Sequence, residues 1–133
     1  MNLPRNFRLM EELDNSSKYK GISYGLQNPD DIDFIYWYGT FITATGHVIN
    51  FNFICDETYP FSSPIFYFDE SYLYLDIDDL DDNEFGILIN KIKELCEEET
   101  IQLKSDLEPI KSWTPIKTIG SLLTEIRELI GEP

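Results

Sequence analysis

The stretch YPFSSPIFYF, residues 59–68, contains two prolines, and the second directly precedes a run of strand-forming residues. Pro60 and Pro64 have no backbone N–H, so each would remove a hydrogen bond from a central strand. A bend that leads into a short strand loses no such bond. The stretch therefore predicts a turn through Pro60, followed by a β-strand over residues 64–68.

Three segments upstream of this bend also have the pattern of β-strands: residues 22–26, 34–43 and 47–55. In the last of them, apolar residues alternate with Asn50 and Asn52, which is the period expected of a strand with one buried face. Turn-forming residues occupy positions 28–31 and 44–46 between the segments. Together with residues 64–68, they predict a four-stranded antiparallel meander.

Three other segments predict helices: residues 4–13, 83–98 and 115–130. Pro4 suits the first turn of the first helix, and apolar residues recur at helical spacing through the second. For the third helix, Thr114 is the expected cap, Pro115 the first residue and Gly131 the end. The fold class expected from helices around an antiparallel sheet is α+β.

The length of 133 residues fits one domain, residues 1–133, and 42% hydrophobic residues predict a packed core. The formal net charge of −15 disfavours nucleic-acid binding, because a phosphate backbone would be repelled. A protein surface that carries some positive charge is the better partner.

Eight acidic residues between Asp69 and Glu84 predict an ordered loop, either solvated or facing a basic partner.

The only two cysteines, Cys55 and Cys96, lack the spacing of a zinc or redox site, so neither a metal nor another cofactor is expected. No apolar run reaches the roughly 18 residues of a membrane-spanning helix, and no secretory leader is evident. These features predict a soluble protein of the cytoplasm and nucleus with no membrane partner.

Four stretches together resemble the ubiquitin-conjugating enzyme variants (UEV), the non-catalytic relatives of ubiquitin-conjugating enzymes. They are PRNFRLMEEL (4–13), SYGLQNPDDI (23–32), WYGTF (37–41) and CDETYPFSSP (55–64). The first looks most like the variants that partner the lysine-63-specific conjugating enzyme. The resemblance implies the ubiquitin-conjugating-enzyme-like (UBC) fold, with an N-terminal helix, a four-stranded meander, a helix packed across the sheet and an end after the helix 115–130.

The resemblance also implies that no catalytic cysteine is present. Active conjugating enzymes carry their nucleophile about eight residues before a tryptophan such as Trp113, and that position is Ser105 here. A serine hydroxyl cannot replace the thiolate in thioester chemistry at neutral pH. Cys55 ends a strand at an inward position, and Cys96 lies on the apolar face of a helix, so both are expected to be buried and structural.

The resemblance assigns binding roles to two groups of residues. Phe7 matches the aromatic that inserts into an active partner, and four neighbours belong to the same segment: Pro4, Arg5, Asn6 and Met10. Ser23 and Thr40 match polar positions that contact an acceptor ubiquitin, and Val48 matches a third, apolar one. The implied function is to bind an active conjugating enzyme as a heterodimer and to orient acceptor ubiquitin for lysine-63-linked chain synthesis. Trp37 and Tyr59 are expected in the core and the bend.

Two departures from the family keep an alternative open. The turn at 43–47 is shorter than the family's loop, and residues 69–100, the acidic loop plus the helix 83–98, form an insertion. A helix after the sheet and the Tyr-Pro-x-x-x-Pro bend also occur in RWD domains, which are protein-interaction adaptors without a ubiquitin role. The segments around Phe7, Ser23 and Trp37 favour the variant over the adaptor.

Overall fold

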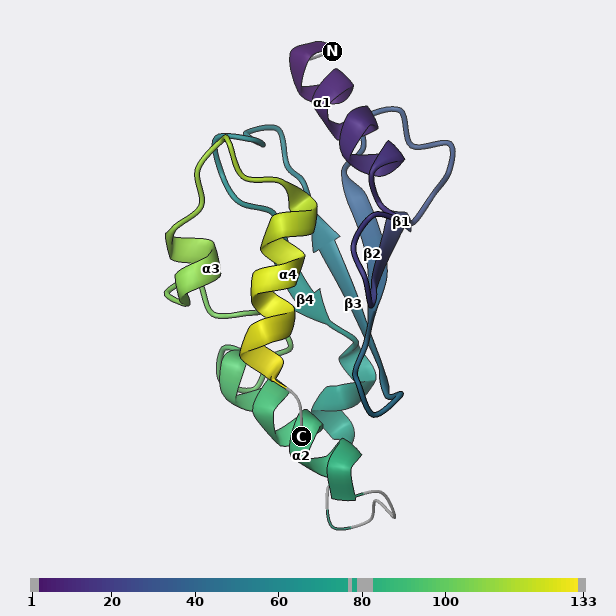
Figure 1. The fold of residues 1–133 in the computed structure, drawn as a ribbon. Helices are drawn as coiled ribbons and strands as arrows, with labels where there is room; N and C mark the ends of the chain where they lie inside the picture. Colours follow the sequence, from purple (N-terminus) through teal and green to yellow (C-terminus); the bar gives the residue numbers. More distant parts are fainter. Residues whose placement is uncertain (1–2, 77, 79–82, 132–133) are drawn as a thin grey trace.

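The computed structural model describes residues 3–76, 78 and 83–131, and Figure 1 shows how their helices and strands are arranged. The elements are α1 (Leu3–Asp14), β1 (Ile22–Leu26), β2 (Tyr36–Ile42), β3 (Val48–Ile54), β4 (Ile65–Phe68), η1 (Glu70–Tyr74), α2 (Asn83–Leu95), α3 (Glu108–Lys111) and α4 (Ile119–Ile130). The four strands form one antiparallel sheet in the order β1-β2-β3-β4. The predicted α+β class and the meander are confirmed.

One face of the sheet supplies most of the core. Alternate residues of β2 and β3 are buried, and their aromatic side chains stack against one another, as in Trp37 on Phe53 at 5.5 Å. Gly39 lies on β2 between the buried aromatic residues Trp37 and Phe41. Glycine suits this position, because a Cβ here would come within 2.5 Å of the Phe51 ring. The opposite residues of the same strands face solvent.

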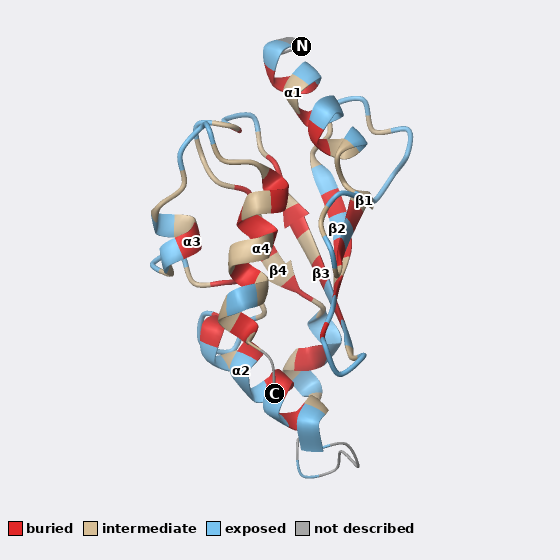
Figure 2. Ribbon diagram, viewed as in Figure 1, coloured by how far each residue is buried: buried red, intermediate tan, exposed pale blue. Residues whose placement is uncertain are grey.

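The helices cover the aromatic face and the two ends of the sheet. Figure 1 shows α4 in front of the sheet, with α1 at one end and α2 at the other. The burial pattern agrees, because the inward face of α4 is red in Figure 2, as are the sheet residues behind it. No helix within the described ranges is long and apolar enough to cross a membrane.

The bend predicted within residues 59–68 is confirmed, and β4 begins at Ile65, directly after the second proline. The Tyr59–Pro60 peptide is cis, and the Tyr59 side chain is fully buried in the core. The Trp113 ring lies 5.7 Å from the Tyr59 ring, and its Nε1 donates to the Pro60 carbonyl at 2.8 Å. The bend thus anchors the loop that precedes α4.

The insertion packs against the β2–β3 end of the sheet. The Tyr72 hydroxyl of η1 accepts the Asn50 N–H at 2.9 Å, and the Phe85 ring of α2 lies 5.8 Å from the His47 ring. Positions 77 and 79–82 of the predicted acidic loop lie outside the described residues. The part that is described therefore has an apolar side, as expected.

The helix predicted over 83–98 ends earlier, at Leu95. Cys96 instead forms a β-bridge with Leu103, and the Glu97 N–H donates to the Gln102 carbonyl at 2.8 Å. The segment 101–103 in turn bonds to the edge of β4 through the Leu103 N–H and the Phe66 carbonyl. Pairing with residues 101–103, which are themselves bound to β4, thus replaces the last turn of the predicted helix, and helical periodicity alone does not reveal it.

The predicted start of the last helix is wrong. Helix α4 begins at Ile119 with Thr118 as its cap, and the Ser121 side chain completes a capping box. Thr114 and Pro115 precede it in a turn, and the next side chain, Ile116, is 90% exposed. The Arg8 guanidinium donates to the carbonyls of Pro115 and Lys117 and holds this turn apart from the helix. The helix end before Gly131 is confirmed.

Candidate functional site

An apolar groove lies between α1 and the loop of residues 28–35, which joins β1 to β2. From α1 come Phe7, which is 64% exposed, and Met10; from the loop comes Ile32, which is 69% exposed. Pro29 and Phe34 complete the apolar lining of a hollow of about 530 Å³. Large apolar side chains that stay exposed beside one another are typical of a protein-docking surface. We call this surface the α1 groove.

Two of the five residues predicted for partner binding face inward. Arg5 is buried, and its guanidinium donates to the carbonyls of Asp33 and Cys55 at 2.6 Å each. Asn6 is buried beside it and donates to the Ile32 carbonyl at 3.4 Å. These two side chains fasten α1 to the loop. Pro4 is exposed on the first turn of α1, so Pro4, Phe7 and Met10 are the ones accessible from outside.

Sequence reasoning missed the loop half of the groove. It treated residues 28–31 only as a connection between strands and gave Ile32 no role. The signal was present, because Ile32 is an isolated apolar residue in the polar run NPDDID, residues 28–33. An exposed apolar residue inside such a turn contributes little to the local structure. Ile32 instead lines the α1 groove together with Phe7 and Met10 of the neighbouring helix.

The outward face of the sheet carries the second group of predicted residues. Ser23 and Thr40 are register partners on β1 and β2, and their hydroxyls lie 2.9 Å apart. Val48, on β3, is 48% exposed and pairs with Ile42, two residues along β2 from Thr40. The structure therefore brings all three onto one surface, which we call the sheet face.

The sheet face is more apolar than the three predicted residues suggest. Tyr36, Tyr38 and Ile42 are all exposed on β2, and Tyr38 helps to line a shallow hollow of about 150 Å³ beside the Ser23–Thr40 pair. None of the four strands contains an Asp, Glu, Lys or Arg residue. Strict alternation along β2 could have identified these tyrosines, because Trp37 and Phe41 occupy the inward positions.

Ser105 occupies an exposed turn after the 101–103 segment. It borders an open hollow of about 270 Å³ together with Ser63 and Gln102. The single histidine, His47, belongs to the β2–β3 turn, where its Nδ1 lies 2.7 Å from the Thr45 hydroxyl. Ser105 and His47 thus belong to different segments of the fold, the turn after residue 103 and the β2–β3 turn.

Both thiols are buried, as predicted. Burial raises the pKa of Cys55 well above its usual value and that of Cys96 to about 12. A thiol in this state is almost wholly protonated at neutral pH and is a poor nucleophile. Within the described ranges, no group of three His, Cys, Asp or Glu side chains is placed to hold a metal ion.

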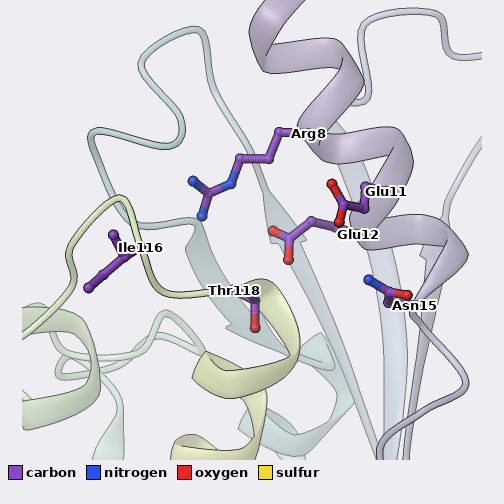
Figure 3. Close-up of a pocket in the computed structure, with 6 residues that line it drawn as sticks. All are labelled: Arg8, Glu11, Glu12, Asn15, Ile116 and Thr118. Atoms are coloured by element: carbon purple, nitrogen blue, oxygen red, sulfur yellow. The ribbon is translucent and has the colours of Figure 1, made fainter.

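A buried carboxylate lies where α1 meets α4, and sequence reasoning missed it. Figure 3 shows Glu12 pointing from α1 toward the first turn of α4, beside Thr118, while Arg8 reaches toward the loop of Ile116. The Tyr59 hydroxyl donates to the Glu12 carboxylate, which also accepts the Ile119 N–H at 3.0 Å. Burial raises the pKa of Glu12, and these two hydrogen bonds oppose the rise. Its bonds make it a structural junction.

The sequence matches no protein-family model. It is 32% identical over 118 residues to an Arabidopsis thaliana protein named ubiquitin-conjugating enzyme E2 variant 1C, covering 79% of this chain and 81% of that protein. It is also 28% identical over 140 aligned positions to the Saccharomyces cerevisiae protein named ubiquitin-conjugating enzyme variant MMS2, covering 98% and 88% respectively.

Solved structures of low sequence identity share the fold. A putative ubiquitin-conjugating enzyme from Plasmodium yoelii superimposes with a TM-score of 0.66 at 18% identity, over 97% of this chain and 73% of that one. A ubiquitin-conjugating enzyme E2 from Plasmodium falciparum gives a TM-score of 0.63 at 17% identity, over 96% and 99%. The UBC fold expected from the sequence is therefore confirmed.

Proposed function

The chain belongs to the ubiquitin-conjugating enzyme variants, and from this membership we propose that it is a non-catalytic subunit that binds an active ubiquitin-conjugating enzyme and orients an acceptor ubiquitin for lysine-63-linked chain synthesis. The observation that carries the proposal is the exposure of Phe7 in the α1 groove. A large aromatic that remains open to solvent beside Met10 and Ile32 is the type of anchor that dominates protein interfaces.

The sheet face is the proposed site for the acceptor ubiquitin. Its Ser23 and Thr40 hydroxyls offer hydrogen bonds next to the apolar side chains of Val48 and Tyr38. The absence of charge along the four strands favours contact with a largely apolar protein surface, since no charged group must be stripped of water.

The two surfaces are directly connected through the chain. The loop that forms half of the α1 groove joins β1 to β2, the strands that carry Ser23 and Thr40. An enzyme bound in the groove and a ubiquitin bound on the sheet face would therefore keep a fixed relative orientation. Holding one lysine toward a partner's thioester replaces a random encounter by a near-intramolecular attack, which accelerates the reaction without chemistry by this chain.

The chain's own groups support a non-catalytic role. The turn that the resemblance aligns with the nucleophile carries the hydroxyl of Ser105, and both thiols are buried with raised pKa values. Such a chain contributes binding energy and geometry, while the active partner supplies the thioester.

The test is a reconstituted reaction. It contains activating enzyme, ATP, ubiquitin and the lysine-63-specific conjugating enzyme of the same organism, with and without this protein. Free lysine-63-linked chains that form only when this protein is added support the proposal. If neither the complex with the conjugating enzyme nor the chains form, the proposal is overturned and an RWD-like adaptor is favoured. A ubiquitin thioester on this protein itself would overturn the non-catalytic role.

A further inference from the structure

The loop that forms the outer wall of the α1 groove is organised by one of its own carboxylates. Asp31 Oδ1 accepts the backbone N–H groups of Asp33 at 2.9 Å and Phe34 at 3.1 Å. Its Oδ2 accepts those of Ile35 at 3.0 Å and Tyr36 at 3.4 Å. A single side chain thus satisfies four successive backbone donors that would otherwise need water or another partner.

The same loop holds a backbone conformation that its sequence does not favour. Phe34 has φ 55°, in the left-handed region that bulky residues seldom occupy. Its carbonyl is fixed by the Trp37 Nε1, which donates at 2.8 Å. Without the bonds to Asp31, the segment between Asp31 and Tyr36 would gain access to extended conformations in which Ile32 points elsewhere.

Helix α1 is tied to this loop from the other side. Arg5 donates to the Asp33 carbonyl at 2.6 Å, and Asn6 donates to the Ile32 carbonyl at 3.4 Å. The helix that carries Phe7 and the loop that carries Ile32 are therefore connected directly. This connection depends on both carbonyls pointing toward α1. The N–H groups of the same two peptide units, those of Asp33 and Phe34, donate to Asp31 Oδ1 and so help to orient them.

We infer that Asp31 is the positioning residue of partner recognition, because it holds the loop so that Ile32 stands opposite Phe7 and Met10 before a partner arrives. This inference rests on the proposed function. The Asp31 carboxylate is engaged by the loop's own N–H groups, so it acts through Ile32 and supplies no charge to the partner. A preformed wall spares the entropy of ordering it at the moment of binding, and so raises affinity.

The electrostatics of the group agree with this geometry. Partial burial alone would raise the pKa of Asp31, but the hydrogen bonds from Ile35, Asp33, Tyr36 and Phe34 outweigh it and lower the pKa. The carboxylate therefore stays ionised at neutral pH and keeps both oxygens as acceptors.

The test compares Asp31→Asn with Asp33→Asn. Asparagine has one acceptor oxygen in place of two. Its NH₂ group must therefore face either the N–H groups of Asp33 and Phe34 or those of Ile35 and Tyr36, and two of the four bonds are lost in either orientation. Asp33→Asn removes the same charge from the same loop, and no hydrogen bond to its side chain is found in the described part of the chain. We expect Asp31→Asn to weaken binding of the lysine-63-specific conjugating enzyme by about tenfold, and Asp33→Asn by less than about twofold.

A second comparison separates positioning from loss of folding. Asp31→Asn and Ile32→Ala, combined, should weaken binding by much less than the product of their separate effects, because both act through Ile32. The combination of Asp33→Asn with Ile32→Ala should be additive. Amide hydrogen exchange of residues 33–36 should accelerate in Asp31→Asn, while the binding of ubiquitin on the sheet face is unchanged.

Each outcome decides a different point. If the wild-type protein does not bind the conjugating enzyme, the proposed function falls, and the inference falls with it. If the wild type binds and Asp31→Asn binds equally well, only the inference is overturned. Equal weakening by Asp31→Asn and Asp33→Asn would assign the effect to charge and would also overturn it, as would additivity of Asp31→Asn with Ile32→Ala.

Discussion

The Glu12 carboxylate, on α1, accepts a hydrogen bond at 3.0 Å from the backbone N–H of Ile119, the first residue of α4. The same carboxylate accepts the hydroxyl of Tyr59 from the bend before β4. One buried side chain therefore joins three segments that are distant in sequence. This junction sets the orientation of α1, the helix that carries Phe7.

We expect Glu12→Ala to lower the free energy of unfolding by about 2 to 3 kcal/mol, because the Ile119 N–H and the Tyr59 hydroxyl would lose their buried acceptor. Glu12→Gln should cost less, since its amide oxygen still accepts the Ile119 N–H. Urea denaturation measures the three proteins. Glu11→Ala, at the exposed neighbouring position, is the matched control and should change stability by less than about 0.5 kcal/mol. An equal loss of unfolding free energy in Glu12→Ala and Glu11→Ala would contradict the role of Glu12 as a junction.

The pH dependence of stability should differ between the wild type and Glu12→Gln. Burial raises the folded-state pKa of Glu12 above its usual 4.5. At a pH between the unfolded and the folded pKa, the folded protein therefore holds a proton that the unfolded chain has released. Stability from this group is therefore complete below the unfolded pKa and is lost as pH rises through the folded one. The Gln variant lacks this loss. As pH rises from about 4 to 7, the free energy of unfolding of Glu12→Gln should therefore increase relative to that of the wild type. The opposite trend would contradict burial as the main cause.

Phe7→Ala should weaken binding of the conjugating enzyme by about 2 kcal/mol, or roughly thirtyfold in Kd, because it removes the aromatic anchor of the α1 groove. Its thermal stability should stay close to wild type, since the side chain is largely exposed. Isothermal titration calorimetry gives the affinity. The matched control is Phe61→Ala, an aromatic that is 80% exposed on the bend and outside the groove. An unchanged affinity in Phe7→Ala would remove the anchor role.

Ser23→Asp should abolish free-chain synthesis while the complex with the conjugating enzyme still forms. The change places a charge on the uncharged sheet face and breaks the 2.9 Å contact between the Ser23 and Thr40 hydroxyls. Chain formation on gels and complex formation by size-exclusion chromatography separate the two surfaces. Ser17→Asp, an identical change at an exposed serine of the α1–β1 connection, should leave both intact. Loss of the complex in Ser23→Asp would show that the surfaces are not independent.

The two thiols should be inert in the native protein. At pH 8 a disulfide reagent such as Ellman's should react with both only after denaturant is added, because Cys55 and Cys96 are buried and their pKa values are raised. The released chromophore counts the reactive thiols with time. Rapid modification of one thiol without denaturant would reopen the question of a nucleophile.

Local sequence patterns predicted the elements whose structure depends mainly on residues within the same segment. The alternation through Asn50 and Asn52 gave β3, and the two prolines of residues 59–68 gave the bend before β4. In each case the deciding interactions lie within one segment or its neighbour.

The misplaced boundaries depend on contacts between distant segments. Helix α2 stops where Cys96 pairs with Leu103, which is itself bound to Phe66 of β4. Helix α4 starts late because Arg8 binds the turn before it and Glu12 accepts the N–H of its first residue, Ile119. The loop wall with Ile32 likewise becomes part of a surface only when Arg5 and Asn6 bring α1 against it. A single sequence carries no direct record of such pairings, so propensity and periodicity miss them.

The four strands contain no Asp, Glu, Lys, Arg or His residue, although the chain as a whole bears a charge of −15. Among the residues that the structure describes, the acidic side chains therefore belong to segments outside the four strands, and we expect two copies that approach face to face to repel each other before their tyrosines meet. Such repulsion should keep the apolar strands available to a partner and limit self-association in dilute buffer. Concentrated salt would screen that repulsion and remove the protection.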